Sequence, residues 1–182
     1  MLDHILRFDT DLLLFIQEYI RNPILTPVFR FITALGDRAM IWIIFSVVLL
    51  MFRKTRKTGV MALFALIFSA LIVNLTLKNL VARPRPFEVI DGLWVLIKKP
   101  KGYSFPSGHT SSAFSAAAVY YKCLDKKYGI PAILLACLIG FSRLYLGVHY
   151  PSDVIAGAII GLTIASAITS IVKLKQLPCE RQ

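Results

Sequence analysis

Apolar residues fill several long stretches of this chain, and most polar residues lie between them. A helix needs about 20 apolar residues to cross the hydrocarbon core of a bilayer. Four segments are apolar over comparable lengths, and a fifth, residues 38–52, is shorter but very apolar. The four longer segments are 58–80, 107–123, 129–147 and 151–172. This pattern predicts a bundle of membrane-spanning helices.

Residues 10–35 are harder to assign, because charged residues interrupt the apolar pattern. Pro23 and Pro27 should also break a helix in this region. We predict one helix over 10–21 and a second over 24–35, which together form one amphipathic or kinked crossing. The total is then about six transmembrane helices, and the alternative is five with an interfacial N-terminal helix.

The composition agrees with a membrane protein. Of the 182 residues, 57% are hydrophobic and 17% are charged, and the mean hydropathy is +0.68. A soluble domain of this length cannot bury so much apolar surface, whereas a bundle surrounded by lipid has no need to. We expect an all-α, polytopic membrane helix bundle in which residues 1–182 form a single domain.

The formal net charge of +11 does not indicate nucleic-acid binding. The cations lie in short loops between apolar segments, where the tendency of positive loops to stay in the cytoplasm explains them. The cytoplasmic cations are then those of residues 53–57 and 122–127 and, in the tail, Lys173, Lys175 and Arg181.

This orientation places three other polar regions on the external face of the cell membrane. They are the basic region 82–106, the turn 143–150 and the turn 36–38. An even number of predicted spans separates these regions from one another. They therefore lie on the same face of the membrane whichever way the bundle is inserted. We therefore expect one site, built where the bilayer meets water.

The first polar cluster follows the segment 58–80. Lys78 closes this segment, and Arg85 lies seven residues later in the sequence Ala82-Arg83-Pro84-Arg85-Pro86. The prolines stop the helix and keep the chain extended, so that Arg85 can return toward Lys78. Cations at a helix end also reach for lipid headgroups. For Arg83 we favour a contact with lipid headgroups. For Lys78 and Arg85, a contact with headgroups and a role in a binding site both stay open.

The second cluster opens the segment 107–123. Ser107 suits the N-cap of a helix, and Gly108 lets the backbone approach a ligand closely. The N-terminus of a helix attracts anions, and His109 in its first turn is placed to donate a proton there. By itself, this sequence is more typical of a capped helix with an interfacial histidine.

The third cluster joins the last two segments. Arg143 lies near the end of 129–147, and His149 and Asp153 flank the start of 151–172. Asp153 lies one helical turn beyond His149 and can accept a hydrogen bond from one imidazole nitrogen. The other nitrogen is then free to act as a nucleophile.

Small residues follow Asp153 at helical spacing: Gly157, Gly161, Ala165 and Thr169. Such stripes let membrane helices approach closely. We predict that this stripe packs the last helix against the bundle and so fixes the position of Asp153.

Together the clusters resemble the three-part signature of the type 2 phosphatidic acid phosphatase superfamily. The matching motifs are Lys78-x6-Arg85-Pro86, Pro106-Ser107-Gly108-His109 and Ser142-Arg143-x5-His149-x3-Asp153. The resemblance covers residues 78–153, and residues 1–57 add only membrane character. The superfamily also includes soluble vanadate-binding haloperoxidases, but the hydropathy of this chain argues against that branch.

The resemblance implies that His149 attacks phosphorus and forms a phosphohistidine, with Asp153 orienting it. It implies that His109 protonates the leaving group and later activates water. It also implies that the phosphoryl oxygens are held by Lys78, Arg85, Ser107, Gly108 and Arg143. Fixed cations suit this reaction, because phosphoryl transfer mainly needs positioning and neutralised oxygen charge. The motifs bring no acidic cluster suited to Mg²⁺, so we expect metal-independent hydrolysis without a cofactor.

The expected substrate is a lipid phosphate, with membrane lipids as the other partners and the oligomeric state left open. Similarity to the small bacterial branch favours hydrolysis of undecaprenyl diphosphate to undecaprenyl phosphate. Phosphatidylglycerophosphate or phosphatidic acid is the nearest alternative, and lipid A phosphate is more remote. An anion transporter would need polar residues along the helix centres, which are mostly apolar. A non-catalytic lipid-binding scaffold would not need both His109 and His149.

Overall fold

The computed structural model describes residues 2–174, with side chains for residues 4–172, and every regular element in this range is helical. The predicted all-α fold is therefore confirmed. The tail residues Lys175 and Arg181, predicted to face the cytoplasm, lie outside the described residues, as does the side chain of Lys173. The elements are α1 (Leu2–Phe15), the π-helix η1 (Ile16–Ile20), α2 (Leu25–Leu35), the 3-10 turn η2 (Asp37–Ala39), α3 (Met40–Met51), α4 (Arg56–Ser69), the π-helix η3 (Ala70–Leu77), α5 (Lys78–Val81), α6 (Pro86–Val89), α7 (Gly108–Cys123), α8 (Lys126–Tyr145) and α9 (Pro151–Leu174).

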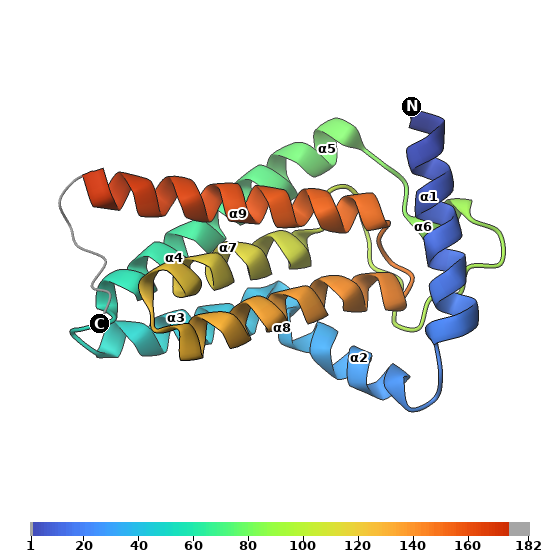
Figure 1. Cartoon of the computed structure of the whole chain (residues 1–182). Helices are drawn as coiled ribbons and strands as arrows, with labels where there is room; N and C mark the ends of the chain where they lie inside the picture. Colours follow the sequence, from blue (N-terminus) through green and yellow to red (C-terminus); the bar gives the residue numbers. More distant parts are fainter. Residues whose placement is uncertain (1, 175–182) are drawn as a thin grey trace.

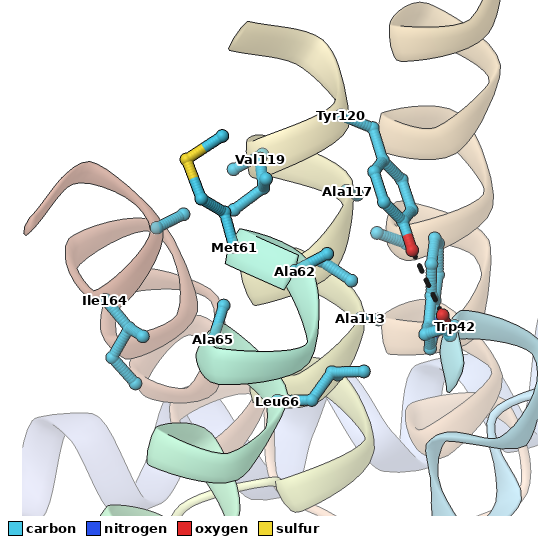
Figure 2. Close-up of a cluster of buried hydrophobic side chains, with 14 of the residues drawn as sticks. Trp42, Met61, Ala62, Ala65, Leu66, Ala113, Ala117, Val119, Tyr120 and Ile164 are labelled. Carbon is cyan, nitrogen blue, oxygen red and sulfur yellow. Dashed lines mark hydrogen bonds between the residues drawn. The ribbon is translucent and has the colours of Figure 1, made fainter. Parts of the chain in front are cut away.

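Helix α7 packs against α4, α8 and α9 and forms the centre of the bundle (Figure 1). Its alanines are small enough to let these helices come close, and Ala113 and Ala117 are fully buried. Figure 2 shows this core, in which the hydroxyl of Tyr120 donates a hydrogen bond of 3.0 Å to the carbonyl of Trp42. This contact joins α7 to α3. Packing on several sides thus fixes α7, whose first turn carries the second polar cluster.

Three segments within the described residues are long and apolar enough to cross a membrane: Arg56–Val89, Lys126–Tyr145 and Pro151–Val172. A fourth crossing results if α2 and α3, bent by 47° at their junction, form one broken span. Helix α7 has 16 residues, fewer than the roughly 20 that a free-standing span needs. The predicted segments 58–80, 129–147 and 151–172 are thus confirmed as apolar helices, but the count of six crossings is not.

Residues 10–35 do not form the single crossing that we predict. Helices α1 and η1 lie across one end of the bundle, whereas α2 runs on toward α3 (Figure 1). The backbone of Arg21 is extended (φ −66°, ψ 131°) and ends η1. The side chain of Asn22 then accepts the backbone N–H of Leu25 at 2.8 Å, which starts α2 in a new direction. Helices α1 and η1 therefore do not continue into α2, and an interfacial position of the N-terminal helix stays a prediction.

The stripe on α9 packs against α7, as predicted. A Cβ atom on Gly157 would lie 2.6 Å from the carbonyl oxygen of Ser107, and one on Gly161 would lie 2.6 Å from that of Ser111. These distances are shorter than van der Waals contact, so the two helices meet where α9 has no side chain. The contact lies one turn beyond Asp153 and directly beneath the N-cap of α7.

We expect Gly157→Leu to lower the midpoint of thermal unfolding in detergent, because overpacking costs typically about 1–3 kcal/mol. The displaced α9 should also lower any activity that depends on Asp153, although no polar group is changed. Ala167→Leu is the matched control, because it makes a comparable enlargement at an exposed position of the same helix. Equal stability and activity of both variants would contradict the packing role of Gly157.

Candidate active site

The three polar clusters meet at the end of the bundle that α1 crosses. There α5 and α8 end, and α7 and α9 begin (Figure 1). Lys78, Gly108 and His109 line one cavity of about 270 Å³ together with Asn74 from η3. The cavity borders the first turn of α7, so the helix N-terminus and the lysine face a common space.

His149 lies in the loop between α8 and α9, and its side chain is only 2% exposed. Its Nδ1 lies 3.3 Å from Oδ2 of Asp153, in the first turn of α9. An ionised carboxylate can only accept a hydrogen bond, so Nδ1 carries the proton and Nε2 keeps its lone pair. The predicted pairing of these two residues is present.

Burial lowers the pKa of His149 to about 3, and the hydrogen bond to Asp153 only partly opposes this shift. The nearby cations Arg143 and Arg85 lower it further. The imidazole is therefore neutral throughout the physiological range, which is the form that a nitrogen nucleophile requires.

The Asp153 carboxylate is fully buried and accepts hydrogen bonds on both oxygens. Its Oδ2 accepts the backbone N–H of Tyr150 at 2.9 Å and the hydroxyl of Ser104. Its Oδ1 lies 2.8 Å from Nη1 of Arg83. These partners hold the carboxylate in one orientation.

Arg83 is the residue for which sequence reasoning was wrong. It is not a cation that reaches for headgroups, because its side chain bridges two buried carboxylates. Nη1 contacts Asp153, and Nη2 lies 2.7 Å from Oδ2 of Asp9 in α1. The guanidinium also lies 3.7 Å over the ring of Tyr150. The guanidinium of Arg83 is therefore paired within the protein.

Arg143, at the end of α8, is buried and donates from Nη1 to the hydroxyl of Thr33 in α2 at 2.5 Å. Its Nε is buried without a hydrogen-bond partner among the described residues. A buried donor of this kind is costly unless a ligand completes it. The positive charges of Lys78, Arg85 and Arg143 lie close enough to repel one another. A phosphoryl group would satisfy the donor and relieve the repulsion.

Arg85 makes different contacts from those expected of a phosphate ligand. Its Nε donates to the carbonyl of Gly102 at 2.8 Å, and its Nη1 donates to that of Val148 at 2.9 Å. Val148 precedes His149 in the chain, so Arg85 also fixes the loop that carries the histidine. A role of Arg85 in holding phosphate stays a prediction.

Ser107 caps α7 as predicted, since its hydroxyl accepts hydrogen bonds from Thr110. Its own backbone N–H donates to the carbonyl of Asp153 at 3.0 Å. This bond joins the first turns of α7 and α9, and thereby links the helix that carries His109 to the helix that carries Asp153. A Cβ on Gly108 would lie 2.8 Å from Oδ1 of Asn74, so glycine permits the close approach of η3.

His109 has its own carboxylate partner, which the sequence did not reveal. Its Nε2 lies 2.8 Å from Oδ1 of Asp37, in the short turn η2. The side chain of Asp37 is largely exposed, in contrast to that of Asp153. The turn 36–38 was predicted to lie at this end of the bundle, but nothing in the sequence pairs it with a particular residue.

Asp9, Ser104 and Asn74 were also missed. Asp9 is a fully buried acidic residue of α1, and nothing in the neighbouring sequence pairs it with Arg83. Ser104 and Asn74 carry no signal either, because serine and asparagine are common in loops and at helix ends. Within the part of the chain whose side chains are described, no group of three or more His, Cys, Asp or Glu side chains could hold a metal ion.

Comparison with known proteins adds to this geometry. A model of the PAP2 superfamily matches residues 58–176. The undecaprenyl-diphosphatase of Sulfolobus acidocaldarius is 36% identical over 68% of this chain and 60% of its own length. The lipid A 1-phosphatase of Rhizobium johnstonii is 34% identical over 78% of this chain and 65% of its own length. The chain thus spans less than two thirds of the length of these curated relatives.

A solved structure has the same architecture along almost the whole chain. The PAP2-type phosphatidylglycerolphosphate phosphatase of Bacillus subtilis superposes with a TM-score of 0.79 at 27% identity. The match covers 94% of this chain and 87% of that one. The shared fold therefore includes the N-terminal region that the superfamily model does not reach.

The buried state of His149 predicts how stability varies with pH. In the unfolded chain the imidazole titrates near pH 6.5, whereas in the folded protein it stays neutral down to about pH 3. The unfolded state therefore takes up the proton first, and stability falls as the pH drops from 6.5 toward 3. At pH 5 the loss should be about 2 kcal/mol.

Thermal unfolding in detergent at pH 7.5 and pH 5 measures this effect. We expect the midpoint of the wild type to fall more than that of His149→Gln, which has no imidazole to protonate. His4→Gln, an exposed histidine in α1, should follow the wild type. A parallel fall in wild type and His149→Gln would show that His149 does not govern the acid sensitivity.

Proposed function

This chain belongs to the PAP2 superfamily, and on that premise we propose that it is a membrane phosphatase acting on a lipid phosphate through a phosphohistidine intermediate. The observation that carries the proposal is the neutral, buried His149, whose Nδ1–H lies against Asp153 at 3.3 Å. This pairing leaves Nε2 as the nucleophile. The unpaired Nε of Arg143 and the lysine-lined cavity supply the anion site that a phosphoryl group needs.

In the first step, the Nε2 lone pair of His149 forms a bond to phosphorus, and the bond from phosphorus to the leaving oxygen breaks. His109 donates a proton to that oxygen. In the second step, His109 takes a proton from water, the water oxygen attacks phosphorus, and the N–P bond breaks to release phosphate. The contact between Asp37 and Nε2 of His109 orients this imidazole at the mouth of the site.

The proposed phosphate ligands are those that the motifs indicate: Lys78, Arg85, Arg143, Ser107 and the backbone N–H of Gly108. Lys78 and the start of α7 border the cavity directly, and the Nε of Arg143 is a donor without a hydrogen-bond partner among the described residues. Arg85 would have to exchange one of its carbonyl partners for a phosphoryl oxygen. No metal ion has a part in this scheme.

The proposed substrate is undecaprenyl diphosphate, converted to undecaprenyl phosphate at the external face of the cell membrane. The name of the Sulfolobus relative supports this choice, and a site at the end of apolar helices suits a lipid with its phosphate in water. Phosphatidylglycerophosphate and lipid A phosphate are the alternatives, since other relatives bear those names.

Activity of His149→Ala tests the mechanism. We expect phosphate release from undecaprenyl diphosphate in detergent to fall by at least about 10³-fold, because the reaction loses its nucleophile. Brief incubation of the wild type with a ³²P-labelled substrate should leave an acid-labile label on the protein, and His149→Ala should carry none. His4→Ala should retain full activity and full labelling. Substantial turnover by His149→Ala would exclude it as the nucleophile.

A panel of lipid phosphates tests the substrate and the absence of a metal requirement. We expect kcat/KM for undecaprenyl diphosphate to exceed that for phosphatidylglycerophosphate, phosphatidic acid and lipid A by about tenfold or more, with no loss of rate in EDTA. A higher kcat/KM for another lipid would reassign the substrate. Loss of activity in EDTA, restored by Mg²⁺, would contradict the metal-free mechanism.

A further inference from the structure

A chain of buried ionic contacts connects His149 and Asp153 to Arg83 and Asp9, two residues that do not define the three motifs. Asp9 of α1 contacts Arg83 at 2.7 Å, Arg83 contacts Asp153 at 2.8 Å, and Asp153 contacts His149 at 3.3 Å. Asp9 and Asp153 have no exposed side-chain surface, and the side chain of Arg83 is 16% exposed. Neither Asp9 nor Arg83 lines the cavity beside Lys78.

We propose that Arg83 and Asp9 are positioning residues for the reaction: Asp9 holds Arg83, and Arg83 holds Asp153 in the orientation that presents His149 to phosphorus. The inference rests on the function proposed above. It assigns a role in the chemistry to the N-terminal helix, which lies outside the residues matched by the superfamily model.

The two oxygens of Asp153 have separate partners. Oδ1 faces Arg83, whereas Oδ2 faces His149, Ser104 and the backbone N–H of Tyr150. Without Arg83, Oδ1 would be a buried anionic oxygen lacking its cation, and the carboxylate would turn to find another donor. Such a turn moves Oδ2 and so changes the orientation of the imidazole. Small errors in the direction of attack are costly for phosphoryl transfer.

Arg83 is itself held on several sides. Its second guanidinium nitrogen pairs with Asp9, its plane lies over the ring of Tyr150, and its backbone carbonyl accepts the N–H of Ser104 at 2.8 Å. Ser104 in turn donates to Asp153. Arg83 thus positions the carboxylate through its side chain and the serine through its backbone. A lysine in its place has one ammonium group and cannot bridge both carboxylates in the same plane.

Asp9 also fixes the helix on which Asp153 lies. Its Oδ1 accepts the backbone N–H of Ser152 at 2.9 Å, and its Oδ2 accepts the Ser152 hydroxyl at 2.5 Å. A carboxylate at the first turn of α9 is favoured by the helix dipole. Helix α1 lies across the end of the bundle at this point, so one carboxylate joins it to both Arg83 and α9 (Figure 1).

Steady-state kinetics of four variants on undecaprenyl diphosphate in detergent test the inference: Asp9→Asn, Arg83→Gln, their combination and Arg83→Lys. We expect Arg83→Gln to lower kcat by about 10–100-fold and Asp9→Asn by about 5–20-fold, with KM within about threefold of the wild type, because the substrate contacts are unchanged. The double variant should be slower than Arg83→Gln by less than the factor that Asp9→Asn costs alone, since Asp9 acts partly through Arg83 and partly through Ser152. Arg83→Lys should be intermediate.

Asp11→Asn is the matched control, because it makes the same change at an exposed position of α1 and should leave kcat unchanged. Each rate is divided by the amount of monodisperse protein from size-exclusion chromatography, so that misfolded protein does not lower the apparent kcat. If Arg83→Gln yields no such protein, Arg83→Lys and Asp9→Asn alone decide the question.

Wild-type kcat in Arg83→Lys and Asp9→Asn, or multiplicative effects of Asp9→Asn and Arg83→Gln, would overturn the inference. Those outcomes leave the proposed function intact as long as His149→Ala stays inactive. Absence of lipid phosphatase activity in the wild type would instead refute the function itself.

Discussion

Charges buried at the end of an apolar bundle must be neutralised by other groups of the protein or by a ligand, and this requirement shapes the site. Asp9 and Asp153 are satisfied by Arg83, by serine hydroxyls and by backbone N–H groups. Among the described residues, no salt bridge joins Lys78, Arg85 or Arg143 to a carboxylate, and their charges repel one another. The protein thus separates two regions. In the first region, the carboxylates are fully paired and keep the side chains in place. In the second region, the cations can still bind an anion.

His149, the proposed nucleophile, lies between these two regions. His149 faces Asp153 on one side and is affected by the charges of Arg143 and Arg85 on the other. Burial and these cations keep the imidazole neutral, and the carboxylate fixes which nitrogen carries the proton. Both conditions come from elements that converge from distant parts of the chain. The hydrogen bond from the Ser107 N–H to the carbonyl of Asp153 then joins the first turns of the helices that carry His109 and Asp153.

Much of this arrangement could be predicted from the sequence, because apolar length and motif spacing are local properties. The helices over 58–80, 129–147 and 151–172, the N-cap at Ser107 and the pair His149–Asp153 all follow from neighbouring residues. Arg83 and Asp9 could not be found in this way. The partners of Arg83 lie 74 and 70 residues away in the sequence, and an arginine before a proline at a helix end is also typical of an interfacial anchor. The relative direction of the two helices in residues 10–35 could not be predicted. The extended backbone at Arg21 ends the first helix, but the local sequence does not determine the direction of the second.

Helix α7 has a further consequence for how the protein reaches its folded state. With 16 residues, many of them alanine and serine, it has little affinity for lipid, and its neighbours shield it on several sides. A segment of this composition does not partition into a bilayer by itself. It has to enter together with the apolar α8, from which only Leu124 and Asp125 separate it. The helix that carries His109 therefore depends for its membrane insertion on the helix that carries Arg143, so that the two helices of this hairpin enter the bilayer as one unit.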